Sequence, residues 1–285
     1  MSQANVLFDA PGPKTLVRNR IIGVIAVTIL LVLIGLLFWG LRGQFTVDKV
    51  AILFQPITWT SSIIPGLINT LQAAEISIVT ALVLGILLGV GRLSDLAPVR
   101  WLCSLIVEFF RAVPVLVMMI FTYQLIIQVL LPLGLVIDSA VISLTSVVVG
   151  LTLYNAAVIA ELLRSGMHAL PKGQREAGLA IGLSSSQTRW AILLPQAITA
   201  MLPSLVSQLV VVLKDSALGS IVLYPELLRS MNTLASNNGN TVAALTLGAL
   251  LYIIINFGLT NFAGFVEKKA SRRTAGRIAR VARKA

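Results

Sequence analysis

The chain has 285 residues, of which 57% are hydrophobic and 12% are charged, whereas soluble globular domains carry about 25% charged residues. This composition predicts a membrane protein. The formal net charge is +11, but the cations gather beside hydrophobic stretches, a pattern that is typical of membrane orientation and argues against nucleic-acid binding. With one cysteine and one histidine, the sequence offers neither an intramolecular disulfide nor a metal-ligating cluster.

Six stretches of the sequence are long and apolar enough to cross a membrane, because a spanning helix needs about 20 apolar residues. They run from Ile21 to Leu41, from about Leu67 to Val90, from Trp101 to Leu131, from Ala140 to Ala160, from Trp190 to Leu213 and from Val242 to Phe265. The first stretch is too long for the apolar region of a secretory signal, so we expect it to remain as a helix. The interval Ser216 to Ser236 is too interrupted to span and predicts one or two short outer helices. The expected fold class is an all-α, polytopic membrane protein with six spans.

The distribution of Lys and Arg residues predicts the orientation of these spans. Most of them lie in the N-terminal segment, in the connections after the second and fourth spans, and after Glu267. Because basic segments stay inside the cell, we expect both termini to be cytoplasmic. The predicted organisation is a cytoplasmic tail (1–20), an extra helix (21–41), a five-helix core (60–266) with a cytoplasmic loop (164–189), and a basic cytoplasmic tail (267–285). This last tail is interpreted as an anchor, although a sensor of anionic lipid would have the same composition.

Polar residues within the spans mark a candidate substrate path, since such residues are costly in lipid and usually face protein or water. Glu75 lies deep in the second span and either pairs with a cation such as Lys214 or contacts the substrate. Lys214 and Asp215 end the fifth span, where a broken helix would expose backbone groups, although an interfacial pair with an outward lysine is the alternative. Hydrogen bonds within the bundle are an equal alternative for the polar residues of the fourth span. The candidate path residues are Glu75, Tyr154, Asn155, Lys214, Asp215 and Ser216.

Two pairs of opposite charge are candidates for gating or structural support at the ends of spans. Glu108 and Arg111 precede Pro114 near the inner end of the third span, and Glu161 and Arg164 lie where the fourth span emerges. A spacing of i and i+3 places both members of a pair on one helix face. We therefore expect each pair to form within its own helix, with a solvated helix end as the alternative for the second pair.

The connection between the fourth and fifth spans is long, polar and rich in glycine. Lys172 to Ile181 holds enough apolar residues for a short helix, which Gly182 would end because glycine accepts a left-handed backbone. Ser184 followed by Gln187 is a capping-box pattern that starts the next helix. Small residues in the first helix would let another surface approach its backbone, so the helix suits docking, and a solvated loop with glycine turns is the alternative. The candidate docking residues are Gly173, Gln174, Arg175, Glu176, Ala177, Gly178 and Gly182.

This connection and its flanking segments resemble one family of transporters. The sequence "GQREAGLAIG" followed by "ILLPQA" resembles the EAA loop of permease subunits of ABC importers. The segments "EFFRAVPVLVMMIFTY", "YNAAVIAELLRSGM" and "VLKDSALGSIV" are similar to those of the branch that imports polar amino acids such as histidine, glutamine and glutamate, and glutamate importers are the most similar. The resemblance covers about Gly66 to Lys268, so the first helix lies outside it and is expected to pack on the periphery. Gly178 stands where the family has alanine, and Ser216 and Ala217 replace Thr-Ser, which removes the second hydroxyl.

The resemblance implies a permease subunit that imports a polar amino acid, with glutamate favoured. An extracellular binding protein would deliver the substrate, this chain and a second permease, related or identical, would form the path, and two ATPase subunits would supply the energy. The docking helix would sit in a cleft of the ATPase and pass its movement to the spans. ATP and Mg would bind the ATPase subunits, whereas this chain would bind no cofactor and carry no catalytic residue; it has no GxxxxGK[ST] pattern to cradle phosphates. The expected location is the bacterial plasma membrane, as a multi-pass protein.

Two other functions fit parts of the sequence. An ion-coupled secondary transporter would use Glu75 or Asp215 to carry protons or sodium, although no internal repeat is visible. A membrane scaffold that recruits a cytoplasmic partner without transporting anything would also need a docking loop. ATP-free uptake by liposomes that contain only this chain would identify the first. Loss of transport in Lys214→Ala with ATPase association retained would argue against the second.

Overall fold

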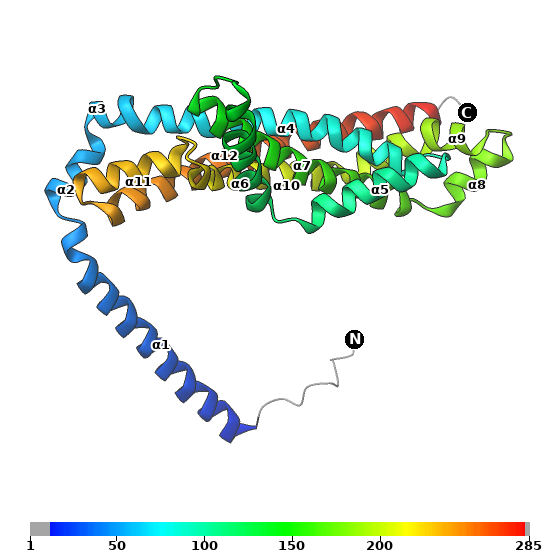
Figure 1. Ribbon diagram of the computed structural model, residues 1–285. Helices are drawn as coiled ribbons and strands as arrows, with labels where there is room; N and C mark the ends of the chain where they lie inside the picture. The colour runs from blue at the N-terminus through cyan, green and yellow to red at the C-terminus, as the bar shows by residue number, and fades with distance from the viewer. Residues whose placement is uncertain (1–11, 283–285) are drawn as a thin grey trace.

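The computed structural model describes residues 12–282, without the side chains of residue 263 and residues 266–282. Throughout this range the chain forms helices and turns and no strand, which confirms the all-α prediction. Six helical segments of the described chain are long and apolar enough to cross a membrane, as the sequence predicts. Four long helices lie side by side in an elongated bundle (Figure 1). They are α4 (Ile64–Arg92), α7 (Ser139–His168), α10 (Leu194–Asp215) and α12 (Thr241–Ala282).

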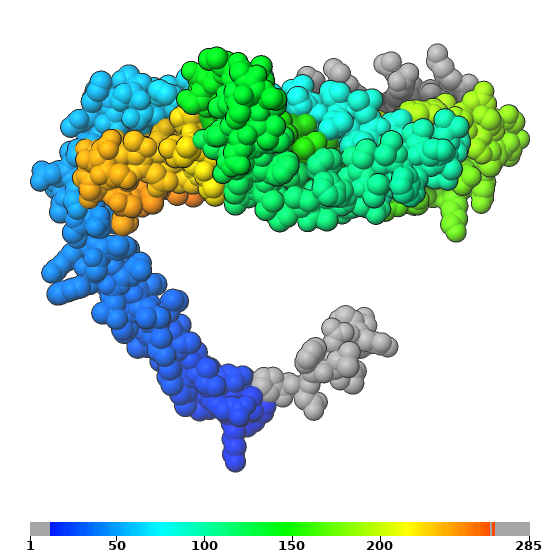
Figure 2. Space-filling view, in the orientation of Figure 1, coloured from blue at the N-terminus to red at the C-terminus, as the bar shows by residue number. Residues whose placement is uncertain are grey.

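The first helix, α1 (Pro13–Leu41), projects away from this bundle (Figures 1 and 2). It begins at Pro13 rather than at Ile21, because proline at the first helical turn needs no partner for a missing N–H. Residues 1–11 of the predicted tail lie outside the described residues. Between Pro13 and Leu41 no residue is buried. The expected packing on the periphery of the core is not observed, since a helix that is apolar on every side has no face that distinguishes the bundle from lipid.

Short helices connect the long ones at the two ends of the bundle. From α1 to α4 they are η1 (Arg42–Gln44), α2 (Val47–Ala51), η2 (Ile52–Phe54), α3 (Pro56–Thr58) and η3 (Trp59–Ile63). From α7 to α10 they are α8 (Lys172–Ala180), α9 (Ser185–Thr188) and η6 (Arg189–Leu193). From α10 to α12 they are η7 (Ser216–Val222) and α11 (Leu227–Asn238), the predicted pair of short helices. Because α8 and α11 lie at opposite ends of the bundle (Figure 1), we call these the α8 end and the α11 end.

The third predicted span, from Trp101 to Leu131, is two helices rather than one. A break at Val113 and Pro114 separates α5 (Ala97–Ala112) from α6 (Val115–Leu125). Proline cannot continue a helix and pushes the residue before it into an extended conformation, and Val113 has φ −85° and ψ 126°. The spanning part is α6 with the short helices that follow it, from Val115 to Leu133. These short helices are η4 (Ile126–Leu130) and η5 (Leu131–Leu133).

The centre of the bundle is the close contact between α4 and α7. A Cβ atom added to Gly85 would lie 2.7 Å from Cβ of Ile159, and one added to Gly89 would lie 2.8 Å from Cδ2 of Leu163. Helices in lipid associate through this kind of close packing over small residues, because burying apolar surface gains little there. The α4–α7 pair is therefore the base to which the polar groups of both ends are attached.

Candidate functional site

The polar connection at the α8 end folds as the sequence predicts, as helix, glycine stop and helix. Gly182 has φ +86°, and its N–H donates to the carbonyl of Leu179 at 3.0 Å, which closes α8. The capping box is present: the N–H of Gln187 donates to Oγ of Ser184 at 3.2 Å, and the N–H of Ser184 donates to Oε1 of Gln187 at 2.8 Å. Local signals therefore set the direction of α8 and of the chain that returns to α10.

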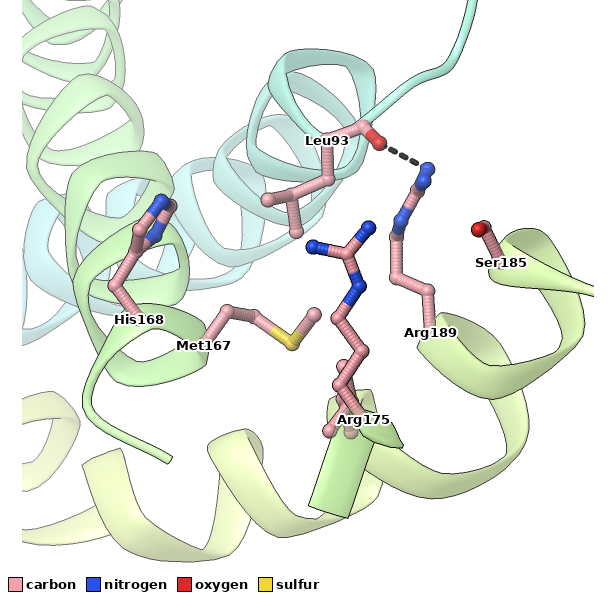
Figure 3. A pocket seen from close by; sticks show the side chains of 7 residues that line it. Leu93, Met167, His168, Arg175, Ser185 and Arg189 are labelled. Atoms are coloured by element: carbon pink, nitrogen blue, oxygen red, sulfur yellow. Dashed lines mark hydrogen bonds between the residues drawn. The ribbon is translucent and has the colours of Figure 1, made fainter. Parts of the chain in front are cut away.

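One of the seven candidate docking residues, Gly178, packs against the chain itself. Gly178 is buried, and a Cβ atom there would lie 2.5 Å from Cγ2 of Thr188. Glycine at this position therefore lets α8 rest on α9, and the alanine expected from the family resemblance would force Thr188 to move. The Arg175 side chain lies beside that of Arg189, below the end of α4 (Figure 3). Gly178 is thus buried between α8 and α9, whereas Arg175 is exposed, and the docking role of the seven candidates stays a prediction.

Every residue of α8 except Gly178 is exposed, and the candidate docking residues Gly173, Gln174, Glu176 and Ala177 are among them. A Cβ atom on Gly173 would meet nothing within 4 Å, so the backbone there is open to an approaching surface. Glu176 forms no ion pair with any residue that the structure describes. A bare stretch of backbone beside an unpaired carboxylate is suited to contact with a separate protein.

Arg189 attaches this connection to the turn between α4 and α5. Its Nη2 pairs with Oδ1 of Asp95 at 2.5 Å, and its Nη1 donates to the carbonyl oxygen of Leu93. The hydrogen bond from Arg189 holds the pKa of Asp95 below its usual value, against the opposing effect of desolvation. The sequence analysis missed this contact, because it joins residues 94 positions apart and no spacing rule relates them.

Glu161 is the centre of an ion-pair network at the same end of the bundle. Its Oε2 lies 2.6 Å from Nη1 of Arg92, and its Oε1 lies 2.6 Å from Nη2 of Arg164. Nη1 of Arg111 lies 3.5 Å from Glu161, and Nη2 of Arg92 lies 3.5 Å from Oε1 of Glu108. The Arg92 side chain is only 7% exposed, so Glu161 neutralises a buried cation. The network joins α4, α5 and α7.

The predicted pair of Glu161 with Arg164 is confirmed, whereas the predicted pair of Glu108 with Arg111 is wrong. Arg111 contacts Glu161 on α7, and Glu108 contacts Arg92 on α4. The reason is that α5 packs across both of these helices, so charges on neighbouring helices compete with the partner on the same helix face. The role of these residues in gating or support stays a prediction.

One of the candidate path residues, Lys214, borders a hollow of about 510 Å³ between α10 and α12. Tyr252, Asn256 and Thr260 supply the other polar groups of its wall, and the remaining lining is apolar. Oδ1 of Asn256 is buried without a hydrogen-bond partner among the described residues. A cation and an unused acceptor in an apolar wall give this hollow the character of a small-ligand site.

Two residues of the predicted path are buried and form hydrogen bonds within the helix bundle. Asn155 is fully buried; its Nδ2 donates to the carbonyl of Leu151 at 2.8 Å, and its Oδ1 accepts from Nε2 of Gln208 at 2.6 Å. Ser216 is also fully buried, and its hydroxyl donates to the carbonyl of Leu213 at 2.7 Å. The hydrogen bonds of Asn155 are the bundle contacts expected as the alternative for the fourth span, and a place along a path stays a prediction for Asn155 and Ser216.

Glu75, the acidic candidate in the second predicted span, does not pair with the lysine of the path. Glu75 and Lys214 are both exposed, and neither belongs to an ion pair in the part of the chain that the structure describes. The predicted pairing of Glu75 with Lys214 is therefore wrong. Asp215 ends α10 as predicted and is half-buried, as is Tyr154. For Glu75, Asp215 and Tyr154 a place along a path stays a prediction.

The sequence analysis missed a polar cluster at the α11 end. Glu226 is fully buried and caps α11, because its carboxylate accepts from the N–H groups of Leu228 and Arg229, each at 2.7 Å. The Tyr252 hydroxyl donates to the same carboxylate at 2.6 Å. Burial raises the pKa of Glu226, and these hydrogen bonds act in the opposite direction. The signal in the sequence is an acidic residue at the N-cap position before an apolar pair.

The same cluster is bound to α4. The Tyr224 hydroxyl donates to the carbonyl of Asn69 at 2.9 Å, and Nδ2 of Asn69 donates to the carbonyl of Pro225 at 2.9 Å. The N–H of Leu227 donates to Oγ1 of Thr70 at 3.0 Å. Burial and the nearby Glu226 raise the pKa of Tyr224 to about 12, so its hydroxyl stays protonated as a donor. The α11 end is therefore fastened to α4 by buried hydrogen bonds.

Comparison with known proteins identifies the group to which this arrangement belongs. Residues 81–272 match the model of a family described as the binding-protein-dependent transport system inner membrane component. The chain belongs to this family. It is 48% identical over 242 residues to the glutamate transport system permease protein GluD of Corynebacterium glutamicum. The aligned residues cover 84% of this chain and 87% of that protein. The chain is 28% identical over 221 residues to the glutamate/aspartate import permease protein GltK of Escherichia coli, which covers 74% of this chain and 97% of that protein.

Solved structures agree with this membership. The fold is similar to a chain from a crystal structure of an amino acid ABC transporter with histidines, with a TM-score of 0.69, 25% identity, and coverage of 79% of this chain and all of that one. It is also similar in fold to a chain of the inward-facing methionine transporter MetNI, with a TM-score of 0.57 and 22% identity over 75% of this chain and 98% of that one.

The chain is thus a permease subunit of an ABC transporter and a multi-pass protein of the bacterial cell membrane. Permeases of this family are not catalytic, and a separate subunit hydrolyses ATP. The family implies an ATPase and a substrate-binding protein as partners, with an amino acid as the substrate. This membership replaces the ion-coupled transporter and the scaffold as explanations of the sequence.

Proposed function

We propose that this permease forms the membrane path of an ATP-driven importer for glutamate, which an extracellular binding protein delivers. The substrate is taken from the name of the relative that is 48% identical over most of both chains. The observation that carries the mechanism is the α8 surface, which is exposed on its outer side and packs at its base on α9 and η6. A helix placed in this way can receive a force and pass it on.

In this proposal α8 and both termini lie in the cytoplasm, as the distribution of basic residues supports. Two ATPase subunits bind ATP and Mg there, one on this chain and one on a second permease, which is a related chain or an identical copy. The ATPase contacts Gly173, Gln174, Glu176 and Ala177 of α8 and the Gly182 turn that ends it. Closure of the ATPase around ATP would then move α8 as a unit, because its end is fixed by hydrogen bonds on both sides of Gly182.

Movement of α8 reaches the spans by two routes. Arg189 connects the returning chain to the end of α4, and α7 leads directly into α8 through the turn at Ala169 to Pro171. Both routes meet at the Glu161 network, where α4, α5 and α7 are joined. We propose that these helices change their arrangement together and open the path alternately to each side of the membrane.

For the substrate, the proposal assigns Lys214 to the path. Its ammonium would attract a carboxylate of glutamate. Glu75, Tyr154 and Asp215 would line the path where a second permease covers the exposed faces of α4 and α10. Lys214→Ala is expected to lower ATP-dependent glutamate uptake at least about tenfold, which corresponds to one charge-assisted hydrogen bond, with ATPase association retained. Unchanged uptake would remove Lys214 from the path.

The coupling role is tested by Glu176→Lys in the assembled importer. The variant reverses a charge on the exposed face of α8 without disturbing any hydrogen bond of the described chain, so folding and membrane insertion should be unaffected. We expect ATP-dependent glutamate uptake in proteoliposomes to be lost. Lys172→Gln, at the start of the same helix and outside the proposed contact, is the matched control and should transport normally. Normal ATP-dependent uptake by Glu176→Lys would refute the coupling role.

A further inference from the structure

A hollow of about 210 Å³ lies on the inner side of α8, against the ends of α4 and α7. The guanidinium groups of Arg175 and Arg189 border it side by side, and Ser185 stands next to Arg189 (Figure 3). Met167 and Leu93 cover the side towards the spans (Figure 3). Arg175 is the residue that α8 contributes to the wall of this hollow, and Gly173, Glu176 and Ala177 of the same helix do not line it.

The charge around this hollow is not balanced by the chain. Arg189 is paired with Asp95, whose side chain is 61% exposed and is therefore shared with water. Arg175 forms no hydrogen bond or ion pair with another described residue. Two adjacent guanidinium groups therefore face a single, largely solvated carboxylate. An anion placed between them would relieve their repulsion and gain charge-assisted hydrogen bonds from both.

The lining of the hollow selects among small anions. The planar fork of a guanidinium group matches the two oxygens of a carboxylate as well as those of a phosphate. Besides the polar side chains of His168 and Ser185, the lining contains Leu93, Met167 and Leu193. A ligand that carries a short carbon chain can cover these apolar side chains and loses less hydration there than a bare phosphate does. The volume is below the range of about 300–1,000 Å³ that is typical for drug-sized ligands. A short-chain carboxylate fits these three conditions.

We propose that this hollow is a regulatory site for a small carboxylate, and that its ligand is the acidic amino acid that the importer releases on this side. The site itself follows from the side chains around the hollow, whereas the choice of ligand rests on the proposed function. A carboxylate that bridges Arg175 of α8 and Arg189 of η6 would hold α8 against the end of α4. Since α8 must move for coupling, product accumulated in the cytoplasm would slow the importer.

Binding is tested on the full chain in nanodiscs of neutral lipid, by calorimetric titration with L-glutamate. We expect Arg175→Gln to weaken the binding at least about tenfold, as the loss of one charge-assisted hydrogen bond does. Arg175→Lys keeps the charge but not the planar fork of the guanidinium group, so its affinity for L-glutamate should lie between those of Arg175→Gln and the wild type. Lys214→Ala removes the cation of the other hollow and should leave this binding unchanged. Binding that persists in Arg175→Gln but disappears in Lys214→Ala would overturn the proposal.

Two further titrations identify the source of the anion. Inorganic phosphate should show no binding that depends on Arg175, and an Arg175-dependent affinity equal to that for L-glutamate would overturn the assignment to a carboxylate. Nanodiscs that contain phosphatidylglycerol should leave L-glutamate binding unchanged. If that lipid abolishes the binding, the hollow is a site for lipid headgroups and the proposal fails. None of these titrations requires transport, so they stand even if the proposed function is wrong.

Regulation is tested with the assembled importer in proteoliposomes that contain ATP inside. Adding L-glutamate to the internal solution should slow uptake by the wild type several-fold, whereas uptake by Arg175→Gln, relative to its own rate without internal glutamate, should not change. Equal inhibition of both proteins would show that internal glutamate acts elsewhere. That result would overturn the regulatory role even if the hollow binds glutamate.

Discussion

The two ends of the helix bundle are held together by different forces. At the α8 end the connections are ion pairs with partly exposed members: the side chain of Arg164 is 38% exposed and that of Asp95 is 61% exposed. At the α11 end Glu226 is fully buried, and its hydrogen bonds sit beside an apolar cluster that contains Leu227 and Met231. Exposed ion pairs exchange with water and salt, whereas buried hydrogen bonds are costly to open. The comparison indicates that the α8 end is built to rearrange and the α11 end to stay fixed.

The largest expected effect comes from removing the carboxylate that neutralises a buried cation at the α8 end. Glu161→Ala would leave Arg92, whose side chain is 7% exposed, without the carboxylate that neutralises it most closely. Removing one partner of a buried ion pair costs about 3–5 kcal/mol. We expect a clear fall in the midpoint of thermal unfolding in detergent. If Glu161→Ala lowered the midpoint of thermal unfolding no more than Arg164→Ala does, the whole α8 end would behave as a solvated surface.

A second substitution tests the buried hydrogen bonds at the α11 end. Glu226→Ala removes the cap of α11 and leaves the Tyr252 hydroxyl without its acceptor, and the two losses together cost about 2–4 kcal/mol. Tyr252→Phe is the matched control, since it removes one hydrogen bond, worth about 1 kcal/mol, and keeps the cap. Thermal unfolding of the two variants measures the difference. Equal midpoints would show that the carboxylate is not what fastens the α11 end.

The two ends should also respond to pH with opposite sign. The pKa of Asp95 is lowered from 3.8, so its stabilising contribution is present above that value and is lost as the pH falls through the lowered pKa. The pKa of Glu226 is raised from 4.5, so its contribution is complete below that value and is lost as the pH rises through the raised pKa.

Unfolding midpoints measured across this pH range for Asp95→Asn and Glu226→Gln separate the two contributions. Asp95→Asn should reduce the loss of stability on the acid side. Glu226→Gln should reduce the decline as the pH rises above 4.5. If both substitutions reduced the loss of stability on the same side of the pH range, the contrast between the two ends would be contradicted.

The smallest effect is expected at a partly exposed member of the network. Arg164→Ala should change the free energy of unfolding by less than about 1 kcal/mol, because surface ion pairs contribute little. The difference from the wild type should shrink further at high salt, since salt screens exposed charges. Thermal unfolding at low and high salt measures it. If the difference exceeded about 1 kcal/mol and did not depend on salt, Arg164 would behave like the buried groups of the α11 end.

The features that the sequence predicted correctly depend on local signals. Long apolar stretches are sufficient to locate the spans, because lipid leaves a chain few alternatives to a helix. The end of α8 at Gly182 and the capping box at Ser184 follow from backbone preferences that act over a few residues. The same is true of the pair formed by Glu161 and Arg164, which are neighbours on one helix.

The features that the sequence did not predict depend on contacts between distant segments. The break at Pro114 is hidden because hydropathy continues across it, although the proline itself is visible. Glu108 pairs with a charge on another helix, and Gly178 packs on Thr188 rather than facing outwards. Spacing along one helix does not report what lies opposite, so a candidate site built from spacing contains correct residues with incorrect partners.

The proposed coupling requires the exposed face of α8 to lie in the cytoplasm and to receive force from a separate ATPase. The most direct measurement places a cysteine at Ala177 in a chain whose natural cysteine is removed by Cys103→Ser, and labels it with a membrane-impermeant maleimide. The account predicts labelling in inverted but not in right-side-out vesicles, and protection when the ATPase subunit is bound. Labelling from the outside, or labelling that the bound ATPase does not reduce, would contradict it.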